Sequence, residues 1–212
     1  HGVVVEPPRV NRSGADATLE PDPASVGGSA VRLGIGSVRG IGAELATRIA
    51  TEAPYSSIDD VARRSAAPRT ALEALATSGA FDGLPVVDGA PSTTARRDAL
   101  WASGALAAGE GRLPGVVVGV SAPPFSAMTP VEAHVADLWA TGVTTDRHPF
   151  SLFRASLAER GVTRAVDLLG CEEGRVLVAG VVTHRQRPST AGGVVFLNLE
   201  DETGTLNVIC SR

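Results

Sequence analysis

The sequence predicts an α+β fold, in which a helical region built around a glycine-rich turn precedes a region of short strands. Two observations on its periodicity support this. Apolar residues recur at helical spacing in residues 31–84 and again from Thr129 onward. After Gly174, apolar residues instead alternate or cluster in short stretches bounded by turn residues, which is typical of strands.

Proline and glycine clusters divide the chain into five segments. Pro7, Pro8, Gly14, Pro21 and Pro23 interrupt the first of them, so we expect no long element there. The predicted segments are an extended entry segment (1–30), a helical domain (31–84), a linker with one helix (85–127), a helical connector (128–170) and a strand region (171–212).

Most of the predicted helices have a recognisable start or stop. One helix spans residues 43–53, the next follows the N-cap residue Ser57, and a third opens at Pro68 and ends at Gly79. Four more are expected at residues 96–106, from Pro130 with Thr129 as N-cap, at 150–160 and at 165–169. Strands are expected at residues 3–5, 176–183, 194–199 and 206–210.

The 212 residues carry a net charge of −4, and all 19 basic residues are arginines. A chain without lysine has no Schiff-base lysine, no Gly-Lys-Ser/Thr nucleotide loop and no Tyr-x-x-x-Lys catalytic pair. The Arg-only composition is typical of GC-rich codon usage, although arginine also suits bidentate phosphate contacts. The acidic net charge removes the strongest sequence indication of nucleic-acid binding without excluding local basic surfaces.

Cysteine content and hydropathy point to a reducing compartment. Cys171 and Cys210 are far apart and have no CxxC pattern, which argues against a disulfide framework and a structural zinc. The longest apolar run, residues 116–120, is too short to cross a bilayer. The chain begins with His1 and shows no signal peptide, so we expect a piece of a longer cytoplasmic protein without membrane contact.

The most informative stretch is Gly-Ser-Val-Arg-Gly-Ile-Gly at residues 36–42. It imitates the Gly-x-x-x-Gly-Ile-Gly turn of short-chain dehydrogenases, a nucleotide site that requires a βαβ unit. The segment after residue 56 is instead helical in pattern. The same stretch, followed by Ala46 and Ile49, also fits a helix-hairpin-helix motif. A third interpretation is a tight turn between packed helices that binds no ligand.

In the helix-hairpin-helix interpretation, five residues form an anion site. Gly40 and Gly42 are expected to adopt backbone angles closed to other residues, while Ile41 turns inward to anchor the loop. The hairpin amides and the start of the helix at Ala43 then point at one DNA phosphate. Arg39 lies at the tip, where its charge adds a contact. Binding through amides carries no base information, so we expect sequence-independent binding to duplex DNA.

The three C-terminal strands resemble the opening meander of an OB-fold, a barrel that requires five strands, so the barrel is expected to be partial. The loop after the first strand is the most basic run in the chain and carries His184, Arg185 and Arg187. If Phe196 faces outward it can stack a base. The alternative is that Phe196 is a core residue and that the arginines mark a solvated hairpin tip.

Taken together, these motifs resemble the bacterial C-family DNA polymerases, whose large subunit ends in a helix-hairpin-helix domain followed by an OB-fold. The resemblance is carried in order by the hairpin 36–42, residues 72–82, the lead-in 147–157, and the segments 186–193 and 196–204. The last two are the most specific. They are more similar to the error-prone, damage-inducible branch than to the replicative polymerase III alpha subunit.

The resemblance implies translesion synthesis with a Y-family-like mutasome partner and the sliding clamp. No Gln-x-x-Leu-Phe clamp peptide is evident, since Ser151-Leu152-Phe153 is a weak match, so clamp contact is expected through the partner protein. The family binds its divalent metal, Mg²⁺, with palm aspartates that would lie upstream of His1. We therefore expect this fragment to need no cofactor, to be catalytically inert, and to bind duplex and single-stranded DNA.

Two other functions remain open at this point. The first is a DNA-binding or scaffold module that does not belong to a polymerase, and the second is a nucleotide-binding domain of the dehydrogenase type. If the upstream sequence of the parent gene lacks the paired palm aspartates of a polymerase, the first alternative is favoured over the polymerase. A second parallel strand after the glycine turn would favour the dehydrogenase alternative.

Overall fold

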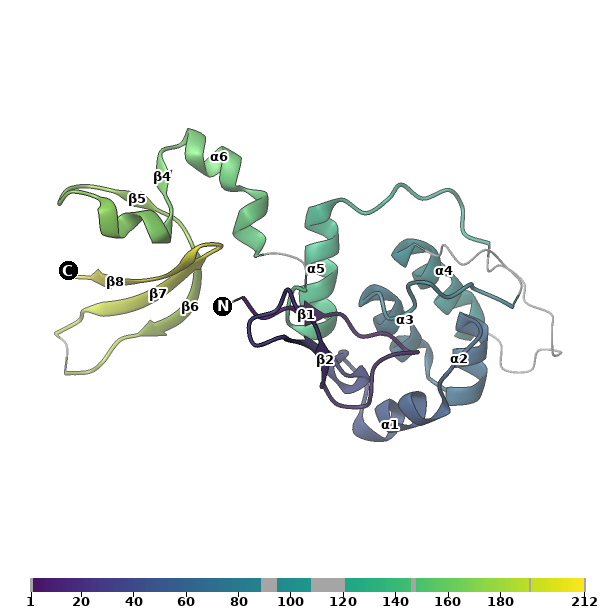
Figure 1. Cartoon of the computed structure of the whole chain (residues 1–212). Coiled ribbons are helices and arrows are strands. Elements are labelled where there is room, and N and C mark those ends of the chain that lie inside the picture. Colours follow the sequence, from purple (N-terminus) through teal and green to yellow (C-terminus); the bar gives the residue numbers. More distant parts are fainter. Residues whose placement is uncertain (1, 89–94, 108–120, 146–147, 191, 212) are drawn as a thin grey trace. The chain divides into compact units, whose positions relative to one another are not determined.

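The computed structural model divides into two compact units, His1–Thr145 and Asp146–Arg212 (Figure 1). The structure describes residues 2–88, 95–107, 121–145, 148–190 and 192–211. The apolar run 116–120, and Arg147 and Ala191 from the motifs of the resemblance, lie outside the described residues.

The first unit opens with a small three-stranded sheet of β1 (Val5–Glu6), β2 (Thr18–Pro21) and β3 (Ser29–Arg32). Strand β3 lies in the centre, parallel to β1 and antiparallel to β2. Its Arg32 is buried and donates to the Glu20 carboxylate at 2.5 Å, which ties β3 to β2. The sequence pattern predicted only a strand at residues 3–5 here, and it did not reveal β2 and β3.

The helices of the first unit follow the predicted caps. Ser57 caps its helix by accepting from the Asp60 N–H, Pro68 precedes the next helix, and Thr129 forms a capping box with Glu132. The elements are a 3-10 helix (Ile35–Ser37), α1 (Ala43–Glu52), α2 (Ile58–Ser65), α3 (Arg69–Thr77), α4 (Arg96–Ala107) and α5 (Pro130–Thr141).

These helices enclose one apolar core. It draws on both sides of the glycine turn and on α1 to α4, so burial of apolar surface fixes the turn against the helices. Its largest fully buried apolar side chains are Phe81, Ile35, Ile49, Ile58, Leu72, Leu75, Val10, Val38 and Val61.

The second unit carries short helices and five strands. The helices are a 3-10 helix (Pro149–Leu152), α6 (Arg154–Glu159) and a second 3-10 helix (Ala165–Gly170). The strands are β4 (Val162–Thr163), β5 (Leu177–Val178), β6 (Val181–Gln186), β7 (Val195–Asp201) and β8 (Gly204–Cys210).

Two predicted elements of this unit are divided in the structure. The helix expected at 150–160 consists of a 3-10 turn and α6, which meet at Phe153. The strand expected at 176–183 is two strands, because β5 pairs with β4 whereas β6 pairs with β7. Gly180 lies between them, and a Cβ there would come within 2.9 Å of the Glu200 carbonyl oxygen.

Strands β6, β7 and β8 form an antiparallel meander, as the sequence predicted. Closure into an OB-fold barrel stays a prediction.

Among the described residues of this unit, Asp201 alone is buried. It accepts hydrogen bonds from Ala165 N–H and Thr203 N–H, each at 2.8 Å, and pairs with Arg154. Asp201 ends β7, and Glu202 lies in the turn that follows, close to the expected turn at both residues. Over the described part of the chain, no helix is long and apolar enough to cross a membrane.

Candidate nucleic-acid interface

The glycine turn forms the expected hairpin between the 3-10 helix and α1. The Ile41 N–H donates to the Val38 carbonyl at 3.1 Å and closes the turn. Gly40 has a φ of +78°, a conformation that favours glycine. Ile41 is buried while Arg39 and Gly40 are exposed, so the loop is anchored by one apolar side chain and presents its backbone outward.

Gly42 does not adopt the backbone conformation that the sequence predicted. Its φ is −77°, so the conformation itself does not require glycine. A Cβ at this position would meet nothing within 4 Å, and the residue is exposed. The glycine therefore leaves open space directly in front of α1, which begins at Ala43.

The backbone N–H groups in front of α1 are free to bind a ligand. In the described parts of the chain, the N–H groups of Gly40, Gly42 and Ala43 have no hydrogen-bond partner. Unpaired amides at a helix N-terminus, with the positive end of the helix dipole behind them, form an anion site. The exposed Glu44 lies in the same first turn, where its carboxylate competes with a bound anion for the positive end of the helix dipole.

Arg39 is held at the hairpin tip by α5. Its N–H donates to the Ala140 carbonyl at 2.7 Å, and its Cζ lies 5.4 Å from the centroid of the Trp139 ring. Sequence analysis placed Arg39 at the tip but did not predict this contact with a distant helix.

The arginines fall into two groups. Most form an ion pair with a carboxylate, and the first unit contains most of these pairs. Where the structure describes the chain, six arginines have no carboxylate partner. They are Arg39, Arg48, Arg160, Arg175, Arg185 and Arg187. All three arginines that the sequence proposed for DNA contact are in this unpaired group, which leaves their charge free for a phosphate.

In the second unit, Phe196 faces outward. It is 39% exposed and lies in register between Gln186 of β6 and Ile209 of β8. Phe196 is therefore exposed in this chain, while base stacking and the core alternative both stay predictions. The ring borders a depression of about 540 Å³ in which polar side chains of all three strands gather. Next to Phe196, the Asn198 Oδ1 is buried without a hydrogen-bond partner among the described residues.

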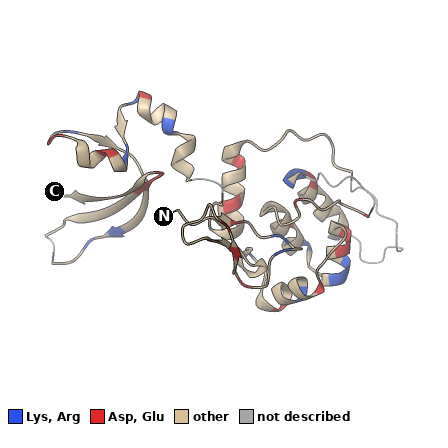
Figure 2. Ribbon diagram, viewed as in Figure 1, with Lys and Arg blue, Asp and Glu red and all other residues tan. Residues whose placement is uncertain are grey.

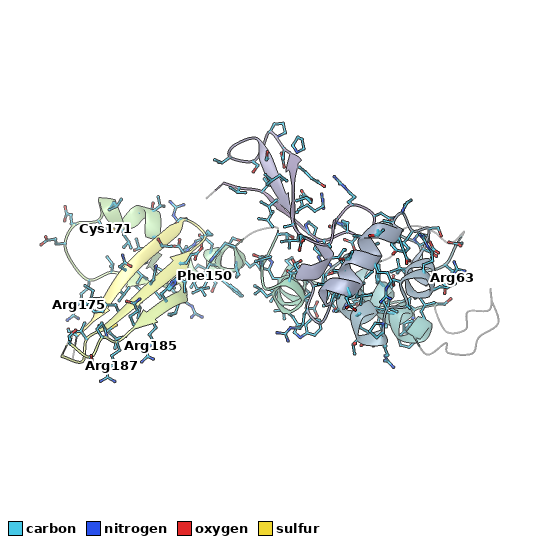
Figure 3. All side chains as sticks on the ribbon, turned by 90° about the horizontal axis from the view of Figure 1, so that it is seen from below. Arg63, Phe150, Cys171, Arg175, Arg185 and Arg187 are labelled. Atoms are coloured by element: carbon cyan, nitrogen blue, oxygen red, sulfur yellow. The ribbon has the colours of Figure 1, made fainter. Side chains whose placement is uncertain are left out.

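Arg185 does not share the face of Phe196. It is in register with Leu197, whose side chain alternates with that of Phe196, so Arg185 projects from the other face of the sheet. Figure 3 shows Arg185 and Arg187 at one end of the second unit, with Arg175 at the same end. The sheet therefore offers an aromatic face and an arginine-bearing end.

Arg175 is a candidate that sequence analysis missed. It is exposed and unpaired among the described residues, and it lies just before β5. The signal was present, because residues 174–199 contain no aspartate or glutamate and Arg175 is the first arginine of that run. Figure 2 shows that the helices of the first unit, by contrast, carry both acidic and basic positions.

The structure contradicts the dehydrogenase alternative. A dinucleotide site requires the helix after the glycine turn to lead into a second parallel strand. Here α1 is followed by α2 and then by α3. The glycine turn therefore belongs to a helical hairpin.

Comparison with known proteins agrees with this geometry. The family described as "Helix-hairpin-helix motif" matches residues 2–88, which include the hairpin and exclude α4, α5 and the second unit. Three similar relatives share the name error-prone DNA polymerase. They come from Nocardia farcinica (48% identity), Mycobacterium tuberculosis H37Rv (46%) and Corynebacterium glutamicum (42%), and each alignment covers the whole chain.

The chain is homologous to the C-terminal end of error-prone DNA polymerases. It spans 18–19% of the length of these relatives. The resemblance to error-prone DNA polymerases is confirmed over the full length of the chain, including α5 and the meander that lie outside the hairpin match.

Proposed function

We propose that this chain is the DNA-binding accessory region of an error-prone DNA polymerase. The observation that carries the proposal is the hairpin itself. Its exposed amides at Gly40, Gly42 and Ala43 have no partner in the described chain, and the buried Ile41 fixes them in place. The chain is similar to DNA polymerases, and a contact with the duplex backbone that is independent of sequence suits such a protein.

The sheet of the second unit supports a different contact. An exposed Phe196 beside amide side chains suits an unstacked base, because aromatic stacking tolerates any base. The unpaired Arg185 and Arg187 add positive charge at the end of the same unit. We therefore assign duplex binding to the hairpin and single-stranded template binding to the sheet.

Titrations of labelled duplex and single-stranded DNA, followed by fluorescence anisotropy at two salt concentrations, test the assignment. We expect weak binding that falls steeply with salt, since phosphate contacts release counterions. Gly42→Val should weaken duplex binding, because its side chain would occupy the open space in front of the amides. Gly170→Val is the matched control, as a Cβ there also meets nothing within 4 Å.

The double variant Arg185→Ala/Arg187→Ala should weaken single-strand binding and leave duplex binding nearly unchanged. Equal losses on both substrates would contradict the division of labour between the units. Absence of salt-sensitive binding by the wild-type chain would reject the proposed function itself.

The parent protein is proposed to carry out DNA-templated nucleotidyl transfer during translesion synthesis in the cytoplasm. Its Mg²⁺ would be bound outside this chain, and among the described residues no cluster of three or more His, Cys, Asp or Glu side chains fits a metal. We propose a Y-family-like mutasome partner, with clamp contact through that partner. Upstream sequence of the parent gene that lacks paired palm aspartates would reject the polymerase assignment.

A further inference from the structure

The C-terminal end of α5 contacts the hairpin tip in two ways. Ala140 is buried, and its carbonyl is one of the last four of the helix, which have no partner within the helix. The Arg39 N–H supplies that partner at 2.7 Å. The Arg39 guanidinium lies over the ring of Trp139, the residue before Ala140. A cation at this end of a helix is also favoured by the helix dipole.

The position of α5 is itself fixed. Asp137 is buried and receives a hydrogen bond from Arg96 of α4 at 2.6 Å. Arg96 lies against Gly79 at the end of α3, where φ is +77° and a Cβ would come within 2.8 Å of the Arg96 Nε. A chain of contacts therefore runs from the end of α3 through α4 to α5, and from α5 to Arg39.

Arg39 differs from the two other arginines that contact α5. Arg96 and Arg97 of α4 each pair with a carboxylate of α5, whereas Arg39 has an aromatic ring and no carboxylate within the described chain. Stacking on an aromatic face orders a guanidinium and leaves its charge and its donors available. An ion pair would have neutralised that charge. The contact therefore orients Arg39 for an anionic ligand.

We propose that Trp139 is a positioning residue for DNA binding, which orders the Arg39 guanidinium at the tip of the hairpin that carries the unpaired amides. The inference rests on the proposed function, and it makes α5 a third element of the DNA-binding hairpin, although α5 lies outside the matched motif region. Trp139 acts through Arg39 and is not itself required to contact DNA.

The test measures duplex binding of the 212-residue chain with Trp139→Ala, Trp139→Phe and Trp101→Ala. Trp101 is the matched control, because it is as exposed as Trp139 and borders the same apolar groove between α4 and α5, but does not stack on Arg39. We expect Trp139→Ala to weaken binding about two- to fivefold, the amount that corresponds to an exposed cation–π contact. Trp139→Phe should restore most of the affinity, and Trp101→Ala should have no effect.

A double-mutant cycle separates positioning from general destabilisation. In an Arg39→Ala background, Trp139→Ala should produce no further loss, because its effect passes through the arginine. An undiminished loss in that background, or an equal loss in Trp101→Ala, would overturn the role of Trp139. The NMR resonance of the Arg39 Nε–H should also be shifted by the ring current in wild type and not in Trp139→Ala.

The positioning role of Trp139 and the proposed function can be refuted separately. If wild-type protein binds duplex DNA and Trp139→Ala binds equally well, the positioning role is wrong and the proposed function stands. If the ring-current shift is present and wild-type protein binds no duplex, the proposed function is wrong, and the DNA-binding role of Trp139 fails with it.

Discussion

The two units present their candidate DNA-binding groups in opposite ways. In the first, a core of some twenty buried apolar side chains fixes a hairpin whose contact groups are backbone amides. In the second, no apolar residue of the described part is buried, and the contact groups are exposed side chains. Amides must be held rigidly to converge on one phosphate, whereas arginine and phenylalanine side chains reach their ligand from a less constrained sheet.

The largest expected effect tests this difference in packing. Leu72→Ala removes a fully buried side chain of α3 and should destabilise the first unit by about 2–5 kcal/mol. Leu197→Ala, at a partly exposed position on β7, should cost the second unit about 1 kcal/mol. Amide hydrogen exchange resolves the two units separately. Equal losses of protection would contradict the proposed difference between the cores.

The second prediction concerns acid. Burial raises the pKa of Asp201, but hydrogen bonds from the Thr203 hydroxyl and from the Ala165, Thr203 and Gly204 N–H groups outweigh burial and hold the pKa below the ordinary value of an aspartate. A lowered folded pKa stabilises the fold above the unfolded pKa, and this stability is lost as the pH falls through the folded value. We therefore expect the second unit to lose structure below about pH 4.

Asp201→Asn is the control, since asparagine does not titrate. This variant should be less stable at neutral pH and should lack the acid step due to Asp201. In the first unit, hydrogen bonding to Arg32 also lowers the pKa of Glu20, but the apolar core there does not depend on pH. A first unit that unfolds at higher pH than the second would reverse the comparison.

Local patterns predicted much of the first unit. The hairpin, α1 and the caps of α2 and α5 were predicted because glycine conformations, cap residues and apolar spacing are short-range features. The N-terminal sheet was not, because its order depends on buried Arg32, which joins β3 to Glu20 and Glu6. A charged residue gives no sequence indication that it will be buried.

The remaining differences have long-range causes. The predicted strand at 176–183 is divided because Gly180 packs against the backbone of Glu200, which a strand pattern alone does not reveal. The site prediction placed Arg39 at the hairpin tip and Arg185 and Arg187 in a loop, and it left Phe196 open between an outward and a core position. It missed that Arg39 contacts α5. It also missed that Arg185 lies in β6, on the face opposite Phe196. These facts depend on tertiary contacts and on the register set by the β-bulge near Thr183.

The third prediction sharpens the role of side-chain charge in the second unit. Arg175→Ala should reduce the salt dependence of single-strand binding, because each neutralised phosphate contributes about 0.7 to the slope of log K against log salt. Arg160→Ala is the matched control, since this arginine of the α6 end is also unpaired among the described residues. The experiment repeats the anisotropy titration over several salt concentrations. An equal change of slope in both variants would indicate a general charge effect.

The smallest expected effect tests the amide site of the first unit. Glu44 lies in the first turn of α1, where its negative charge occupies the favourable end of the helix dipole and repels an approaching phosphate. Glu44→Gln should therefore strengthen duplex binding about two- to fivefold, the range that corresponds to a surface charge at a helix N-terminus.

Glu52→Gln, at the other end of the same helix, is the control for net charge and should change affinity less. Because single-strand binding is assigned to the second unit, and both glutamates lie in α1 of the first, it should respond equally little to both variants. A gain on single strands as large as the gain on duplex would mean that the hairpin and the sheet bind as one surface, and the distinction between an amide site and a side-chain site would fail.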